Sequence, residues 1–132
     1  MTTSFLYLIS LSMKPYQDAR VEGEKLAKQY AELEKADQVD FFNGSEAYYS
    51  VLGHNKKQEA IAVLIEKNDH KIYVYQLDKG ISQDKAATIS REKGASDIDK
   101  VTFGRYQDKP IWEVKSGNQY YLVDFETGAV IL

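Results

Sequence analysis

The 132-residue sequence contains no cysteine, which excludes a disulfide framework, a thiolate metal site and a thiol nucleophile. It also contains no Gly-x-Ser-x-Gly elbow and no glycine-rich phosphate loop. The two histidines, His54 and His70, fall in separate predicted turns, without the spacing of a zinc-binding motif. We therefore predict a protein that is not an enzyme and has no catalytic, cofactor-binding or metal-binding residues.

A basic cluster and a long apolar run are also missing. The net charge is −3 and the lysines are interleaved with acidic residues, which disfavours nucleic-acid binding. The apolar stretch of residues 5–11 is far shorter than the roughly 20 residues of a membrane helix. Two interpretations of residues 1–13 stay open: an N-terminal extension that packs on the core, or the outer end of a membrane anchor.

Three pairs of carboxylates lie close together in the sequence: Asp37/Asp40, Asp97/Asp99 and Asp124/Glu126. A glycosidase needs two carboxyl groups across a cleft, one of them with a pKa raised by burial. Nothing in the sequence indicates such burial. We therefore expect solvated carboxylates, with Asp124 and Glu126 on the same outward face of a strand.

The first half of the chain is predicted to form one helix followed by strands. Apolar residues at spacings of three and four predict a helix from Tyr16 to Lys35. Asn43-Gly44 is a strong signal for a two-residue hairpin, and residues 53–57 are expected to form a polar turn. Strands are expected at residues 39–42, 46–52, 59–66 and 71–77. Asp78-Lys79-Gly80 is the expected hinge to the second half.

The second half begins with a short capped helix. Ser82 is placed to accept a hydrogen bond from a free amide of the first turn, and Gly94 is placed to end the helix. Alternating apolar residues then predict three strands: Val101/Phe103, Trp112/Val114 and Tyr121/Val123/Phe125. Residues 126–128 form a predicted tight turn. A final strand is expected at residues 129–132.

This C-terminal third resembles a PepSY domain. The residues that carry the resemblance are Ile81, Ser82, Ala86, Gly94, the pair Trp112-x-Val114 and the motif Val123-Asp124-x-x-Thr127-Gly128-x-Val130. The whole chain is further similar to the YpmB/TseB-like proteins of Gram-positive bacteria. That resemblance implies an extracytoplasmic protein, anchored to the cell membrane by an N-terminal helix outside this sequence. It also implies a role in regulating cell-wall elongation.

The two halves resemble each other, because Tyr49-x-Val51 corresponds to Trp112-x-Val114 in the order of elements. We predict an α+β fold of two tandem units, each a helix packed on an antiparallel sheet in the PepSY/cystatin-like manner. Residues 14–79 would form a diverged N-terminal unit and residues 80–132 the C-terminal PepSY unit. Units of this size bury little surface alone, so we expect them to pack as one body.

Tyrosine is abundant, with ten residues in the chain. Alternation places Tyr49, Trp112 and Tyr121 in the core, and it places Tyr48 and Tyr120 on the opposite faces of their strands. The candidate partner-binding residues are Tyr48, Tyr73, Tyr75 and Tyr120. Two explanations stay open: cross-strand packing of aromatic rings, or a protein contact surface. An open sheet edge, such as the final strand, could also accept a partner strand.

The sequence therefore favours a non-catalytic binding module that modulates a cell-wall synthesis enzyme. The resemblance implies that this partner is a penicillin-binding protein. The alternative is a peptidase inhibitor or a propeptide-like regulator of an extracellular protease, as PepSY domains in protease precursors are. Joint removal of Tyr48 and Tyr120 should weaken binding without unfolding the protein, whereas loss of folding would place these residues in the core.

Overall fold

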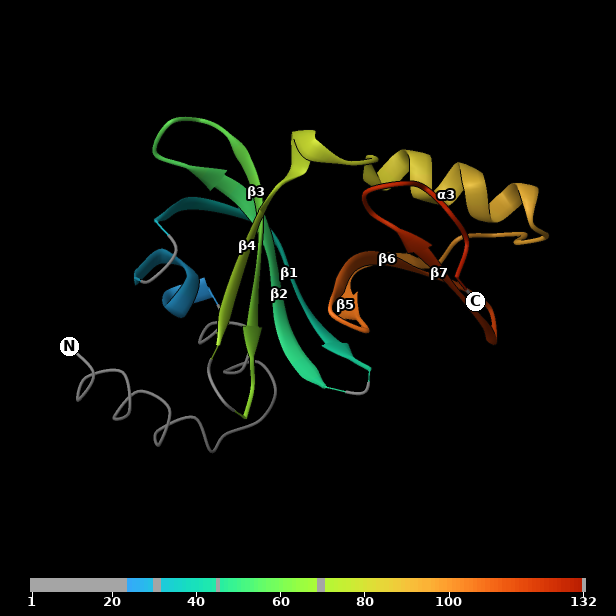
Figure 1. The fold of residues 1–132 in the computed structure, drawn as a ribbon, viewed down its shortest axis with the longest axis horizontal. Coiled ribbons are helices and arrows are strands. Elements are labelled where there is room, and N and C mark those ends of the chain that lie inside the picture. Colours follow the sequence, from blue (N-terminus) through green and yellow to red (C-terminus); the bar gives the residue numbers. More distant parts are fainter. Residues whose placement is uncertain (1–23, 30–31, 45, 69–70, 132) are drawn as a thin grey trace. The chain divides into compact units, whose positions relative to one another are not determined.

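The computed structural model describes residues 24–29, 32–44, 46–68 and 71–131, and it has an α+β fold (Figure 1). Contacts within the chain define two compact units, Met1–Val74 and Tyr75–Leu132. One antiparallel sheet has four strands and the other has three. The predicted fold class is confirmed. The assignment of residues 14–79 and 80–132 as copies of one domain stays a prediction.

The four-stranded sheet is a simple meander in the order β1-β2-β3-β4. Its strands are β1 (Leu33–Asn43), β2 (Ala47–Asn55), β3 (Ala60–Glu66) and β4 (Ile72–Gln76). Val39, Val51 and Val63 lie opposite one another across β1, β2 and β3. β2 and β3 are buried along most of their length on both faces.

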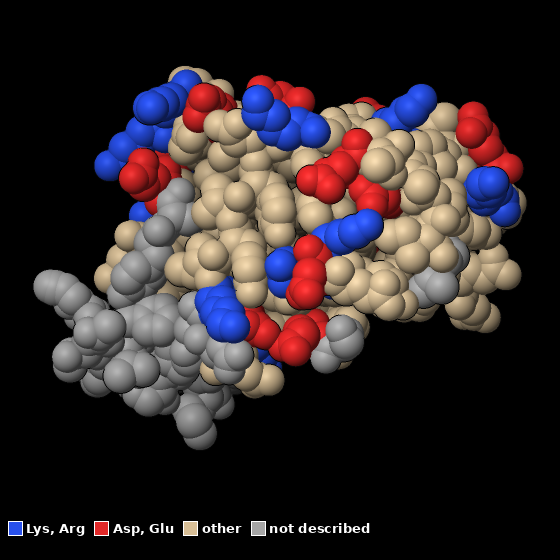
Figure 2. All heavy atoms as spheres, in the orientation of Figure 1, with Lys and Arg blue, Asp and Glu red and all other residues tan. Residues whose placement is uncertain are grey.

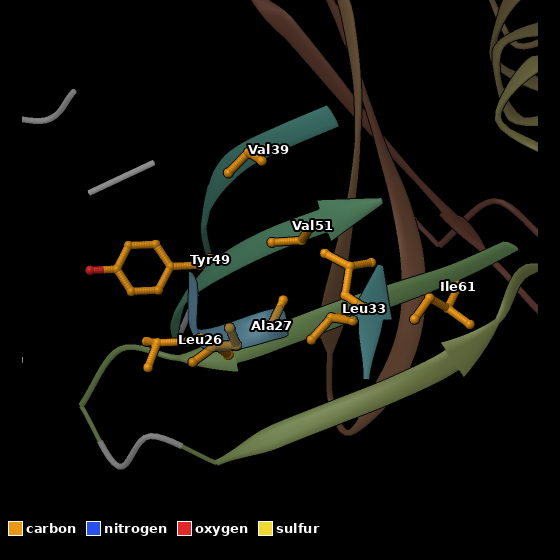
Figure 3. Close-up of a cluster of buried hydrophobic side chains, with 9 residues drawn as sticks. Leu26, Ala27, Leu33, Val39, Tyr49, Val51 and Ile61 are labelled. Carbon is orange, nitrogen blue, oxygen red and sulfur yellow. The ribbon is translucent and has the colours of Figure 1, made fainter. Parts of the chain in front are cut away.

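One face of this sheet packs on the helical residues 24–29. The buried side chains of this core are Leu26, Ala27, Leu33, Val39, Tyr49, Val51, Ile61, Val63 and Ile65 (Figure 3). Leu26 and Ala27 come from the helix and have no exposed surface. They belong to the apolar stripe predicted from the sequence, and the stripe is buried because it faces the alternating apolar residues of the strands.

The predicted helix from Tyr16 to Lys35 is wrong at its C-terminal end. Leu33 already belongs to β1, where it pairs with Asn55, and Glu32 before it has a positive φ of 58°. Sheet pairing therefore overrides the helical spacing of Leu33. The part of the predicted helix before residue 24 lies outside the described residues. β1 is also much longer than the predicted strand of residues 39–42.

The first hairpin also differs from the prediction. Asn43 pairs with Ala47, so three residues rather than two connect β1 and β2. The predicted polar turn at residues 53–57 is wrong at its start, because β2 continues to Asn55. Gly53 lies inside β2 opposite Ala36, between two register shifts in β1 at Leu33/Lys35 and Ala36/Gln38. A Cβ atom on Gly53 would lie 2.0 Å from the Lys35 carbonyl oxygen, so the irregular β1 backbone explains this glycine.

The second unit contains the 3-10 turn η1 (Leu77–Lys79), the helix α3 (Gln83–Glu92) and three strands. The Ser82 hydroxyl accepts a hydrogen bond from the Lys85 amide (3.0 Å), which confirms the predicted N-cap. Gly94 follows the helix with a φ of +113°, which confirms the predicted C-terminal glycine. Local sequence signals were therefore sufficient to place α3.

The three-stranded sheet has the order β5-β6-β7, formed by β5 (Lys100–Tyr106), β6 (Lys109–Ser116) and β7 (Gln119–Asp124). α3 contacts all three strands. On the side of α3, Phe103, Trp112 and Val123 are paired across the sheet and buried. The Trp112 indole N–H donates a hydrogen bond to the Ile81 carbonyl (3.0 Å), which ties the sheet to the segment before the helix.

The C-terminal segment follows the predicted turn but does not form the predicted final strand. The turn is confirmed, with Gly128 at a φ of +81°. Beyond it, a bridge between Val123 and Val130 and two backbone hydrogen bonds hold the segment beside β7, one from the Ile131 amide to the Leu122 carbonyl (2.7 Å) and one from the Asp124 amide to the Ala129 carbonyl (2.8 Å). Leu132 lies outside the described residues. The predicted return of residues 129–132 against the neighbouring strand is therefore confirmed as far as Ile131, although a single bridge at Val130 forms in place of a regular strand.

Candidate functional site

The structure places Tyr48 and Tyr73 on one face of the four-stranded sheet, opposite the core that contains Tyr49. Tyr48 packs between Phe42 (ring centroids 6.2 Å apart) and Tyr73 (6.3 Å). Its exposed fraction is only 3%, whereas the sequence predicted an outward ring. The aromatic neighbours on adjacent parts of the sheet cover it. Removal of Tyr48 would therefore test folding rather than binding.

Tyr75 belongs to the second unit and is held there by two contacts. Its ring lies 5.6 Å from the Phe103 ring, and its hydroxyl accepts a hydrogen bond from Arg105 Nε (3.1 Å). Arg105 Nη1 in turn lies 3.5 Å from Asp108 Oδ1. The ring and the hydroxyl of Tyr75 thus already have partners within the chain, so Tyr75 is not a free contact residue.

Tyr120 differs from the other three tyrosines because its ring is open to solvent. Its exposed fraction is 54%, the largest among the exposed large apolar side chains of the described residues. It lies on β7 next to Tyr121, which is partly buried on the side of α3. Because neighbouring residues of a strand point to opposite faces, Tyr120 lies on the sheet face away from α3.

The register places two lysines in line with Tyr120. Lys115 of β6 pairs with Tyr120 on one side and with Lys100 of β5 on the other. We call Lys100, Lys115 and Tyr120 the Lys-Tyr row. The sequence analysis did not identify the two lysines as site residues, because they are 15 and 5 residues away from their neighbours in the row. Only strand pairing brings these three residues together.

A second row lies next to the Lys-Tyr row on the same sheet face, and it is formed by Thr102, Glu113 and Leu122. Thr102 and Leu122 are buried. Burial raises the pKa of Glu113 above its ordinary value, and the nearby Lys100 ammonium lowers this pKa by a smaller amount. The carboxyl group is therefore less readily ionised than the carboxyl group of an exposed glutamate.

The raised pKa of Glu113 predicts a pH-dependent stability. A carboxyl group with a raised folded-state pKa contributes stability that is present below its unfolded-state pKa and is lost as the pH rises through the folded-state pKa. We expect Glu113→Gln to raise the free energy of unfolding, relative to the parent, more at pH 7 than at pH 4. Urea titrations at both pH values measure this, with the exposed Glu126→Gln as the control. An equal effect of Glu113→Gln at both pH values would contradict the prediction.

Two other titratable residues singled out from the sequence, His54 and Asp124, have partners within the chain. His54 lies in β2 rather than in a turn, with Nδ1 3.0 Å from Asp37 Oδ2; His70 lies outside the described residues. Asp124 is buried, contrary to the prediction, because its Oδ1 accepts hydrogen bonds from the amides of Glu126 (2.8 Å) and Thr127 (3.0 Å). Among the described residues, no group of three or more His, Asp or Glu side chains could hold a metal ion.

Charges of both signs are mixed on the surface. On the face drawn in Figure 2, Lys and Arg side chains lie beside Asp and Glu side chains. This distribution accords with the interleaved charges of the sequence and contrasts with the basic stripe of a nucleic-acid-binding protein. Within the described part of the chain, no helix is long and apolar enough to cross a membrane.

The fold and this surface define the class first: a small α+β protein with two antiparallel sheets and an aromatic-basic row on the second. Comparison with known proteins defines the family. Residues 22–66 match the model of the cell wall elongation regulator TseB-like domain. The chain is 35% identical over 142 residues to "Probable cell wall elongation regulator TseB" of Bacillus subtilis (strain 168), with 96% of this chain and 88% of that protein covered.

A solved structure supports the same assignment. The YpmB protein from Bacillus subtilis matches with a TM-score of 0.71 and 35% identity, covering 83% of this chain and 91% of that chain. The chain therefore belongs to the TseB-like family, as the sequence resemblance predicted. The family is named for regulation of cell-wall elongation and not for a catalysed reaction, which agrees with the prediction of a non-enzymatic protein.

Proposed function

We propose that this protein is a non-catalytic, extracytoplasmic binding module that regulates cell-wall elongation by contacting a wall-synthesis enzyme. The observation that carries the proposal is the similarity to the Bacillus subtilis regulator over 96% of this chain. Following the sequence resemblance, we further propose that the enzyme is a penicillin-binding protein. We also propose that an N-terminal helix tethers the protein to the cell membrane.

Photo-cross-linking in cells tests this proposal. A photo-cross-linking amino acid is placed in turn at four exposed positions of the tagged full-length protein: Phe41, Val74, Thr88 and Tyr120. After irradiation, fluorescent penicillin is added. It labels every penicillin-binding protein, because each of these proteins is acylated by penicillin. We expect at least one position to yield an adduct that carries both the tag and the penicillin label.

Two results would contradict the proposal. Adducts without penicillin label at all four positions would exclude a penicillin-binding protein as the contacted enzyme. Adducts with a secreted protease would favour the alternative, a propeptide-like regulator or peptidase inhibitor. A sample without irradiation and the untagged strain are the controls, because both should lack the doubly labelled band.

A further inference from the structure

The first hairpin places an exposed asparagine directly before an exposed glycine. Asn43 is the last residue of β1, and Gly44 begins the connection to β2. Asparagine is one of the thermolabile residues of proteins. Its side-chain carbonyl carbon, Cγ, can be attacked by the backbone nitrogen of the next residue, which closes a succinimide ring. A glycine in the next position favours this attack, because it has no Cβ atom to crowd the nitrogen and it allows many backbone conformations.

The Asn43 side chain is not held by hydrogen bonds within the described part of the chain, and Asn55 provides the contrast. Asn55 Oδ1 accepts hydrogen bonds from the amides of Lys57 (2.9 Å) and Glu59 (3.0 Å). Asn55 Nδ2 donates a hydrogen bond to Glu59 Oε1 (2.8 Å). These bonds restrain the Asn55 side chain, whereas the exposed Asn43 side chain can rotate toward the Gly44 nitrogen.

The packing of the hairpin explains why the residue after Asn43 is a glycine. A Cβ atom on Gly44 would lie 2.9 Å from Phe42 Cε2 and 3.2 Å from Phe42 Cζ. The Phe42 ring has little room to move away, because its exposed fraction is 2% and it packs against Tyr48. A side chain at position 44 would protect Asn43 by crowding the attacking nitrogen, but the hairpin has no space for one.

The restraint on the attacking nitrogen is weak. Within the described residues, the Gly44 amide donates one hydrogen bond, to the Glu46 carbonyl, and its length of 3.2 Å is at the long end for such bonds. Asn43 and Ala47 form the outermost pair of the two strands. Opening at the end of a hairpin costs little free energy compared with global unfolding. The Gly44 nitrogen can therefore be released while the rest of the sheet stays folded.

We propose that Asn43 is a site of spontaneous deamidation. The Gly44 nitrogen gives up its proton and forms a bond to Asn43 Cγ, and the bond from Cγ to Nδ2 breaks. Nδ2 leaves with that proton as ammonia. Water then opens the succinimide at either of its two carbonyl groups, which yields aspartate or isoaspartate. This inference goes beyond the proposed function and does not depend on it.

Both products change the hairpin. Each adds a negative charge near the exposed Glu46. Isoaspartate also lengthens the backbone before Gly44, because the chain then continues through the side-chain carbon of residue 43. This insertion lies next to the pair of Phe42 and Tyr48, which are both buried. The modification therefore acts on the packing of the four-stranded sheet as well as on its surface charge.

The test follows every asparagine of the purified, folded protein during incubation at neutral pH in water enriched in heavy oxygen. Trypsin then releases residues 36–56 as one peptide, and fragment-ion spectra distinguish Asn43 from Asn55 within it. Asn118 is the matched position, because it is exposed between β6 and β7 but is followed by Gln119. We expect Asn43 to convert about tenfold faster than Asn55 or Asn118, because glycine leaves the attacking nitrogen uncrowded.

The products and two variants test the route. The ring route yields isoaspartate, which an isoaspartyl methyltransferase labels, whereas direct hydrolysis of the amide yields aspartate alone. Asn43→Gln should abolish this label, because the longer side chain would have to close a larger ring. Gly44→Ala should slow the conversion about tenfold. Circular dichroism checks that each variant is folded, and the isoaspartate label of the parent tests the route even where Gly44→Ala does not fold.

Three results would overturn the inference. Conversion of Asn43 no faster than that of Asn118 would show that the folded hairpin protects it. Conversion of Asn43 in urea but not in the folded protein would show the same. Aspartate at position 43 without isoaspartate would exclude the attack by the Gly44 nitrogen.

Discussion

Trp112→Ala is expected to lower the free energy of unfolding of the second unit by about 3–5 kcal/mol, the usual range for removing a buried large aromatic side chain. The exposed fraction of Trp112 is 1%, and its ring meets Phe103 edge-on with centroids 5.0 Å apart. The substitution would leave a cavity between α3 and the sheet. It would also leave the Ile81 carbonyl without its indole donor.

The measurement must report on the second unit alone. Hydrogen exchange of the amides in β5, β6 and β7 meets this requirement, combined with urea unfolding followed by circular dichroism. Trp112→Phe is the control, because it retains an aromatic ring and removes the hydrogen bond to Ile81. We expect a smaller loss of about 1–3 kcal/mol for this variant. Equal protection of these amides in Trp112→Ala and the parent would show that the aromatic cluster does not stabilise the unit.

Gly53→Ala is expected to destabilise the first unit by about 3 kcal/mol, at the upper end for an overpacked core. The added Cβ would lie 2.0 Å from the Lys35 carbonyl oxygen and 2.8 Å from Leu33 Cδ1. The nearest obstacle is backbone, so a side-chain rotation cannot remove the clash. The irregular part of β1 would have to move away from β2.

Urea unfolding by circular dichroism and exchange of the β1 and β2 amides measure this loss. The single tryptophan, Trp112, gives a separate fluorescence signal from the second unit. Gly117→Ala is the matched control, because nothing lies within 4 Å of its added Cβ and only its φ of +61° opposes the change. We expect about 1 kcal/mol for this control. A Gly53→Ala protein as stable as Gly117→Ala would contradict the close approach of β1.

The sequence predicted those elements whose signals are local. Ser82 and Gly94 bound α3 correctly because capping depends on a few neighbouring residues. β5, β6 and β7 follow the alternation of their apolar residues. The helix was extended too far because Leu33 fits a helical stripe as well as a strand, and its pairing with Asn55 decides between them. No local pattern contains that pairing.

A prediction of the candidate site would have required the pairing register of the strands as well. Alternation placed Tyr48 and Tyr120 alike, yet one is covered by rings from other parts of its sheet and the other is open. Burial on both faces of a strand depends on what packs there, which periodicity alone does not give. Lys100 and Lys115 could be recognised as neighbours only after β5 and β6 had been aligned.

The irregular course of β1 has a consequence for self-association. β1 is an edge strand of its sheet, and an edge strand presents backbone groups that can pair with another molecule and start aggregation. The two register shifts interrupt a straight pairing surface, and the exposed charged residues Glu34, Lys35 and Asp37 lie along the same stretch. The bulges that require Gly53 therefore also protect this edge from edge-to-edge pairing between copies of the chain.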